Sequence, residues 1–249
     1  MNFIKQFAVA ISALTVAFVT PVAAGTTHVA VAANFTEPSK EIAALFKART
    51  GHEAVLIFGA SGAFYTQITH EAPFEVFLSA DSERPRLAVD NGYAVPDSLF
   101  TYAIGKLALW SRVVDVTKGE EALKTGAFSK LAIANPNSAP YGTAAIETLK
   151  ALNLYDSFQS KIVQGSSIAQ AFQFVDTKNA EVGFVALSQI INTTDGTRWL
   201  VPEKLYTPIR QDAVLLKRGA NDAASKAFVE FLKGPEARAV IQKFGYGQD

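Results

Sequence analysis

The chain of 249 residues contains no cysteine. This absence excludes disulfides, a thiolate metal site, a cysteine nucleophile and a lipid anchor on an N-terminal cysteine. Histidine is also scarce, and His28, His52 and His70 lack the spacing of metal ligands, so we interpret them as structural or surface residues. Burial of apolar side chains must therefore hold the fold together, and a hydrophobic content of 49% is sufficient for that.

The chain has no net charge, because 23 Lys and Arg are balanced by 23 Asp and Glu. A nucleic-acid-binding protein normally carries a clustered basic excess, so the balance argues against nucleic acid as a partner.

Only one long apolar run is present, at residues 7–19. It is shorter than the about 20 residues that a membrane span needs. Lys5 precedes it and small residues follow at 20–24, which is the layout of a secretory signal peptide. We interpret residues 1–24 as that signal, with a retained membrane anchor as the alternative, and expect a soluble protein exported to the periplasm.

Beyond the signal, strand-like and helix-like segments alternate, as in α/β proteins. Short β-rich runs are expected as strands at 28–33, 54–58, 76–79, 106–111, 131–134, 162–163, 182–185 and 213–216. Helices are expected between them; Ile168, Phe172 and Val175, for example, have the i, i+4, i+7 spacing of one helix face.

No Gly/Ser-rich linker divides the chain. This is typical of a two-lobed molecule whose chain crosses between the lobes more than once. We expect one lobe at residues 26–103 together with 209–249, and the other at 104–208.

Four expected strand-to-helix junctions are rich in small and hydroxyl residues: 33–36, 59–62, 139–142 and 165–168. The first N–H groups of a helix have no partner within it, and the helix dipole adds positive character there. Such ends bind anions without a cationic side chain. Ligands of α/β sheets also collect at the carboxyl ends of the strands, where these junctions lie. The pattern predicts an anion site, although each loop taken singly is also an ordinary helix cap.

None of the four loops contains Arg, Lys, Asp or Glu. A protonated anion such as phosphate needs an acceptor for its proton, whereas a fully ionised tetrahedral dianion needs only donors. About five to seven hydrogen bonds of roughly 1.5–3 kcal/mol each would support micromolar to nanomolar binding after the costs of desolvation and closure. The loops therefore favour a sulfate-like ion.

A series of motifs carries a family resemblance. In chain order they are AANFT, FGASGAFYTQI, APFEVFLSAD, FTYAIGKLALWS, NPNSAPYGTAA, EVGFVALSQI and FLKGPEA. The series resembles the periplasmic molybdate-binding proteins of ABC importers over essentially the whole mature chain, and APFEVFLSAD and NPNSAPYG are its specific parts.

The resemblance implies a type II periplasmic-binding-protein fold with a ligand cleft between two lobes. It implies capture of molybdate or tungstate and delivery to a membrane permease. We accordingly expect a monomer without catalytic residues, cofactor or bare metal ion.

Carried over by position, the resemblance implies these oxyanion-binding residues: Ala33, Asn34, Ala60, Ser61, Tyr141 and Ile168. Asn34 stands where the family has a Ser or Asn donor, and Ser61 is expected to donate through both its hydroxyl and its backbone N–H. Tyr141 and Ile168 are expected to donate through their backbone N–H groups. Ala33 and Ala60 precede the first two residues in the same loops.

One position departs from part of the family. Some members have a tyrosine where this chain has Ala186, whose side chain cannot donate. Our hypothesis is that the hydroxyl of Tyr141 replaces the missing one or that its ring closes the pocket.

Two other functions remain open. One is a binder of another anion, such as sulfate or a small carboxylate; an amino-acid binder would be expected to carry an Arg and an acid in these loops. The other is an exported enzyme on the same scaffold. Residues 59–63 partly match a nucleophile elbow, but Ala63 replaces the second glycine and no histidine base is evident.

Overall fold

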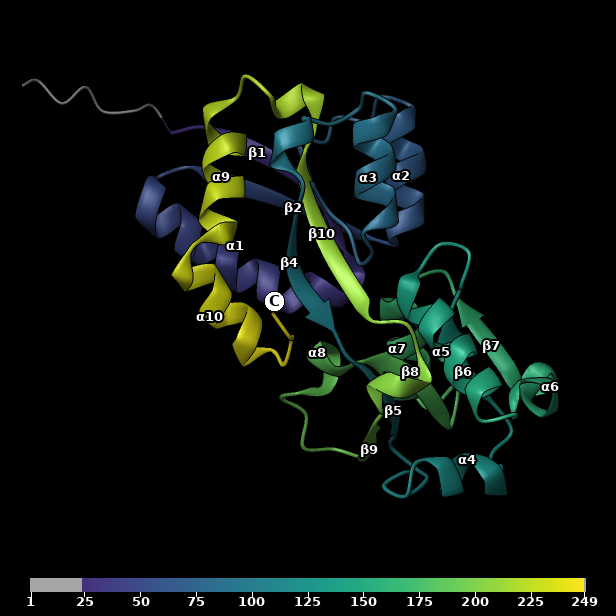
Figure 1. Ribbon diagram of the computed structural model, residues 1–249. Coiled ribbons are helices and arrows are strands. Elements are labelled where there is room, and N and C mark those ends of the chain that lie inside the picture. The colour runs from purple at the N-terminus through teal and green to yellow at the C-terminus, as the bar shows by residue number, and fades with distance from the viewer. Residues whose placement is uncertain (1–23, 249) are drawn as a thin grey trace, which may run out of the picture.

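The computed structural model describes residues 24–248, so the interpretation of the N-terminal segment as a signal peptide falls almost entirely outside the described residues. Figure 1 shows two α/β units, each built around its own sheet. Within residues 24–248, no helix has the length and apolar character needed to cross a membrane.

The first sheet has the strand order β2-β1-β3-β10-β4. Its strands are β1 (Thr26–Ala32), β2 (Glu53–Gly59), β3 (Val76–Leu78), β4 (Phe100–Gly105) and β10 (Ile209–Leu215). The first three are mutually parallel, and β10 runs antiparallel to both of its neighbours. Its helices are α1 (Thr36–Thr50), α2 (Ser61–Thr69), α3 (Glu83–Asp90), α9 (Ala223–Lys233) and α10 (Pro235–Lys243).

Helices cover both faces of this sheet, with α2 and α3 on one side and α1, α9 and α10 on the other (Figure 1). The alternation of side chains along β1 explains how both faces are filled. Val29 and Val31 belong to the cluster with Phe46 and Phe228, whereas Ala30 packs into the cluster of Phe64.

The second sheet has the order β7-β6-β8-β5-β9. Its strands are β5 (Leu107–Ser111), β6 (Leu131–Ala134), β7 (Ile162–Gly165), β8 (Val182–Ala186) and β9 (Thr197–Leu200). Strands β7 and β8 are parallel to β6, while β5 is antiparallel to β8 and β9. The helices of this unit are α4 (Glu120–Thr125), α5 (Pro140–Ala151), α6 (Tyr155–Phe158), α7 (Ile168–Asp176) and α8 (Leu187–Ile190). Short 3-10 turns complete both units: η1 (Ala33–Phe35), η2 (Pro96–Ser98), η3 (Gln159–Lys161), η4 (Glu203–Leu205) and η5 (Lys217–Gly219).

The expected α/β architecture with two units is confirmed. Two strands, β4 and β9, were not expected from the sequence, nor were the short helices α4, α6 and α8. The expected loop at 135–142 is also shorter, because α5 begins at Pro140. Proline is favoured at a first helical position, since its ring fixes a helical φ and its missing N–H would have no partner there.

The chain passes from the first sheet to the second at Lys106, between β4 and β5, and returns between β9 and β10. Strand β4 stays in the first sheet as far as Gly105, beyond the expected boundary at residue 103. The division into lobes at 26–103 with 209–249, and at 104–208, stays our proposal.

Candidate functional site

A small cavity of about 10 Å³ lies where the two units meet. It is lined by Ala32, Ala33, Asn34, Gly59, Ala60, Ser61, Ala80, Ala139, Pro140, Tyr141 and Ile168. All six residues singled out from the sequence are in this set. They come from segments that follow β1, β2, β6 and β7, so the carboxyl ends of parallel strands from both sheets converge on one point.

Helix starts present backbone N–H groups to the cavity. Ser61 and Ile168 are the first residues of α2 and α7, and Tyr141 follows the N–H-lacking Pro140 at the start of α5. N–H groups at these positions have no acceptor within their own helix. Asn34 lies in η1, which runs directly into α1. Four helix starts therefore point partial positive charge at one small space.

The hydroxyl of Ser61 is buried and oriented by a neighbour. It accepts a hydrogen bond from the N–H of Ala80 at 2.9 Å. Because a hydroxyl both accepts and donates, this bond leaves its hydrogen free to donate into the cavity. Ala80 was not among the candidates from the sequence, although the APFEVFLSAD motif that contains it was recognised.

Asn34 is 2% exposed, and only the NH2 group of its side-chain amide has hydrogen-bond partners in the described residues. Its Nδ2 donates to Gln211 Oε1 at 2.9 Å and to the Tyr246 hydroxyl at 3.0 Å. Its Oδ1 is the buried side-chain polar atom for which residues 24–248 supply no partner. A buried polar atom without a partner costs about 1–3 kcal/mol, so the orientation of this amide depends on the hydrogen bonds of its neighbours.

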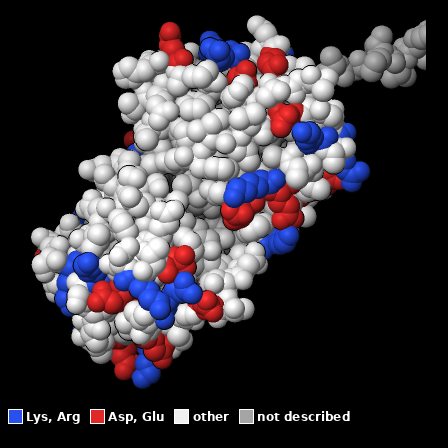
Figure 2. Space-filling view, turned by 180° about the vertical axis from the view of Figure 1, so that it is seen from behind, with Lys and Arg blue, Asp and Glu red and all other residues white. Residues whose placement is uncertain are grey.

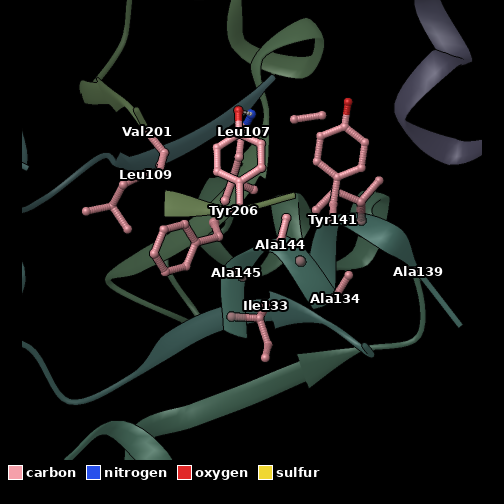
Figure 3. Close-up of a cluster of buried hydrophobic side chains, with 14 of the residues drawn as sticks. Leu107, Leu109, Ile133, Ala134, Ala139, Tyr141, Ala144, Ala145, Val201 and Tyr206 are labelled. Atoms are coloured by element: carbon pink, nitrogen blue, oxygen red, sulfur yellow. Dashed lines mark hydrogen bonds between the residues drawn. The ribbon is translucent and has the colours of Figure 1, made fainter. Parts of the chain in front are cut away.

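Tyr141 is 1% exposed and packs into the hydrophobic core of the second unit. Figure 3 shows its ring close to Ala139 and Ala144, with the hydroxyl pointing away from these alanines. The hydroxyl accepts a hydrogen bond from Gln211 Nε2 at 3.1 Å. The ring thus forms a wall of the cavity, while donation by the hydroxyl to a ligand stays a prediction.

Three tyrosine hydroxyls near the cavity keep their hydrogens. Burial is the main reason that the pKa values of Tyr102, Tyr141 and Tyr246 are raised above the ordinary value for tyrosine. The tyrosine hydroxyls around Asn34 are therefore uncharged over the physiological range. Sequence reasoning missed Tyr102, Tyr246 and Gln211; Gln211 stands between Arg210 and Asp212 in β10, so its neighbours in the sequence gave no sign that it is buried.

Direct hydrogen bonds join the two units around the cavity. The N–H of Gly62 donates to Ser138 O at 2.9 Å, and Ser188 Oγ donates to Asn34 O at 2.8 Å. A Cβ on Gly62 would lie 2.9 Å from Ser138 Cα, closer than real Cβ atoms approach another atom. The structure is therefore a closed arrangement, and a side chain at position 62 would oppose it.

Charge is arranged around the cavity but not in it. None of the lining residues is ionisable except Tyr141, and Asp81, which follows the lining residue Ala80, is paired with Arg84. On the face seen in Figure 2, basic and acidic side chains alternate without forming a large patch of one sign.

No metal centre is formed within residues 24–248 by three or more His, Cys, Asp or Glu. His52 is buried and accepts from the N–H of Gly25 at 2.8 Å. His28 lies 3.4 Å from Glu75, and His70 contacts Thr66 O at 2.7 Å. These contacts agree with the interpretation of the three histidines as structural or surface residues.

Two α/β units that close on a small, donor-lined cavity define a solute-binding protein. The chain belongs to the family of bacterial extracellular solute-binding proteins, whose model matches residues 27–247. It is 58% identical to the molybdate-binding protein ModA of Rhodobacter capsulatus, with 94% of this chain and 93% of that protein covered. It is 52% identical to a molybdate-binding protein ModA of Azotobacter vinelandii, with 88% of this chain and 89% of that protein covered.

Among solved structures, the periplasmic molybdate-binding protein of Azotobacter vinelandii superimposes with a TM-score of 0.86 at 39% identity. The match covers 90% of this chain and 99% of that one. The likeness therefore extends over both units and over all the segments that line the cavity.

Proposed function

We propose that this protein captures molybdate between its two lobes as the solute-binding component of an ABC importer, and that it also takes tungstate. One observation carries the proposal: helix starts and neutral side chains from both units enclose one cavity that no charged side chain lines. The name of the relatives at 58% and 52% identity supports molybdate as the ion.

The chemistry of the lining residues supports a fully ionised tetrahedral oxyanion. The N–H groups of Ser61, Tyr141 and Ile168, together with the Ser61 hydroxyl, can only offer hydrogens to such an ion. No carboxylate lines the cavity to accept the proton of a protonated phosphate. Sulfate carries the same charge and shape, so it is the second candidate, and discrimination between the two must come from the size of the closed cavity.

In this proposal the protein binds and releases its ligand without chemistry, and it has no cofactor. The cavity offers donors but no pair of an acid and a base, which a hydrolase would need. We further propose that it works as a monomer in the periplasm and delivers its ligand to a membrane permease. The family description as extracellular solute-binding proteins supports export.

Titration calorimetry with molybdate, tungstate, sulfate and phosphate in parallel tests the proposal. We expect saturable one-to-one binding of molybdate and tungstate with a Kd in the micromolar to nanomolar range, and much weaker binding of sulfate and phosphate. Tight binding of sulfate would assign the protein to the second candidate. Absence of binding by all four ions would overturn the proposal.

A further inference from the structure

The amide of Asn34 belongs to a buried polar network centred on Gln211. Gln211 lies on β10, is 0% exposed, and its Oε1 is 2.9 Å from Asn34 Nδ2. The same side chain contacts the hydroxyl of Tyr102 on β4 at 3.1 Å and that of Tyr141 on α5 at 3.1 Å. Gln211 therefore connects Asn34 to tyrosines from both units.

With the two amides in this orientation, the network has two defects. One polar atom has no hydrogen-bond partner, and one hydroxyl has fewer hydrogens than its contacts require. Asn34 Oδ1 has no partner in the described residues, although it is buried. The Tyr102 hydroxyl has one hydrogen but lies near two acceptors, Ser79 O at 3.0 Å and Gln211 Oε1 at 3.1 Å. One of these two contacts must bring oxygens together without a hydrogen between them.

Exchanging nitrogen and oxygen in both amides gives Asn34 Oδ1 a donor and resolves the two contacts of the Tyr102 hydroxyl, and it leaves the unpartnered position of Asn34 to its NH2 group. A primary amide turned by 180° occupies the same space, so hydrogen bonds alone decide its orientation. Gln211 Nε2 then donates to Asn34 Oδ1 and to the Tyr102 hydroxyl, which in turn donates to Ser79 O. Gln211 Oε1 accepts from the Tyr141 hydroxyl.

The turned arrangement gives up one bond, from the Asn34 amide to the Tyr246 hydroxyl. Ser188 Oγ lies 2.8 Å from Asn34 O and can donate there in either arrangement, so the single hydrogen of Tyr246 can be directed at Asn34 Oδ1 or at Asn34 O. In return, the Asn34 NH2 group takes the place of the unpartnered Oδ1. An anion in the cavity then meets a donor in place of a carbonyl oxygen.

Asn34 cannot turn alone, because its Oδ1 would then face Gln211 Oε1 at 2.9 Å. The two amides must turn together. We propose that Gln211 is a positioning residue that holds the NH2 group of Asn34 toward the bound oxyanion. The inference rests on the proposed function, and the neutral tyrosines support it, because each keeps the hydrogen that the network needs.

The substitution Gln211→Met tests this role, because it keeps the length of the side chain and removes both the oxygen and the NH2 group of the amide. We expect molybdate binding to weaken by about tenfold or more, the value of a hydrogen bond to a charged group. In the Asn34→Ala background, the same substitution should change the Kd by less than about twofold, since there is no amide left to orient. Additive losses would mean that Gln211 acts independently of Asn34 and would overturn the proposal.

A spectroscopic signature separates positioning from a general loss of structure. In ¹H–¹⁵N spectra of the wild-type protein, the side-chain NH2 signals of Asn34 should shift on saturation with molybdate. They should shift much less in Gln211→Met at saturating molybdate. Ser98→Ala is the matched control: it removes a buried hydrogen bond to Leu215 N in the same sheet, away from Asn34, and should lower the melting temperature while leaving the Kd unchanged.

The controls also separate the two proposals. If wild-type protein binds no molybdate, the proposed function fails and this inference fails with it. If wild-type protein binds molybdate and Gln211→Met binds it equally well, the proposed function stands and Gln211 is only a structural residue.

Discussion

Two hollows lie side by side between the units, and they differ in size and in charge. The donor-lined cavity has a volume of about 10 Å³ and contains no charged side chain. The neighbouring cleft has a volume of about 450 Å³ and is lined by Asp81, Glu83, Arg84, Glu147 and Arg210. Both share Ala80 and Pro140 as lining residues, so the hollows are adjacent.

The difference between them shows why the larger hollow is the poorer candidate. In the cleft, polar groups already have partners: Arg84 pairs with Asp81 and donates to Asn137 O, and Glu147 accepts from the N–H of Thr207. In the small cavity, the N–H groups of Ser61 and Ile168 at the helix starts have no acceptor within their own helices. A ligand gains most where it satisfies groups that folding has left without partners.

The largest expected effect comes from placing a negative charge in the uncharged cavity. Ser61→Asp should weaken molybdate binding by roughly 1,000-fold or more, because like charges in close contact cost several kcal/mol. Calorimetry measures the loss, with thermal unfolding as a check of folding. Glu147→Gln changes charge in the cleft and should alter the Kd by less than about twofold. An unchanged Kd in Ser61→Asp together with tighter binding in Glu147→Gln would place the ligand in the cleft.

A smaller loss is expected at the contact between the units. Gly62→Ala adds a Cβ that meets Ser138 Cα at 2.9 Å and must push the units apart. Overpacking typically costs about 1–3 kcal/mol, so the affinity should fall by about tenfold, measured by calorimetry. Unchanged affinity would show that binding does not require this closed arrangement.

Removal of one hydroxyl should have a smaller effect still. Tyr141→Phe leaves the ring in the wall of the cavity and removes the hydroxyl that is hydrogen-bonded to the amide of Gln211. The loss of one neutral hydrogen bond is about 1 kcal/mol, which corresponds to a Kd about fivefold weaker. A Kd equal to that of the wild type would restrict Tyr141 to packing and reject its hydroxyl as a replacement for the one missing at Ala186.

The smallest effect is expected from pH. Burial raises the pKa of Tyr102, Tyr141 and Tyr246, so these hydroxyls stay neutral where exposed tyrosines begin to ionise. The Kd for molybdate should therefore change by less than about twofold between roughly pH 6.5 and 9. A steep dependence in that range would show that a titrating group contacts the ligand.

The same pKa shifts set the sign of the stability change in alkali. A group whose pKa is raised by folding binds its proton more tightly in the folded state, so its contribution is complete below the unfolded pKa. The free energy of unfolding should thus fall only above about pH 10, where tyrosines of the unfolded chain ionise. Denaturant unfolding at several pH values measures this free energy.

The local parts of this account could be predicted from the sequence. Strand runs such as residues 131–134 and the helix starts after 59–62 and 165–168 are short-range patterns of apolar, small and hydroxyl residues. The rule that ligands collect at the carboxyl ends of strands then places the loops together. The strand TRWL of β9 carries too short a pattern to be recognised.

The network around Asn34 could not be predicted in this way. Gln211 and Tyr246 contact Asn34 from positions 177 and 212 residues further along the chain, and no local spacing relates them. Their roles depend on which atoms of each side chain donate and accept, which only the folded arrangement shows. The start of α5 at Pro140 was missed because the proline pattern of NPNSAPYG was interpreted as loop throughout.

The most direct test of the central claim is a crystal structure of the protein with molybdate, using the anomalous signal of molybdenum to locate the ion. We predict a single peak in the small cavity, within hydrogen-bond distance of the N–H groups of Ser61 and Ile168 and of the side chain of Asn34. A peak in the neighbouring cleft beside Arg84, with none in the small cavity, would contradict the account.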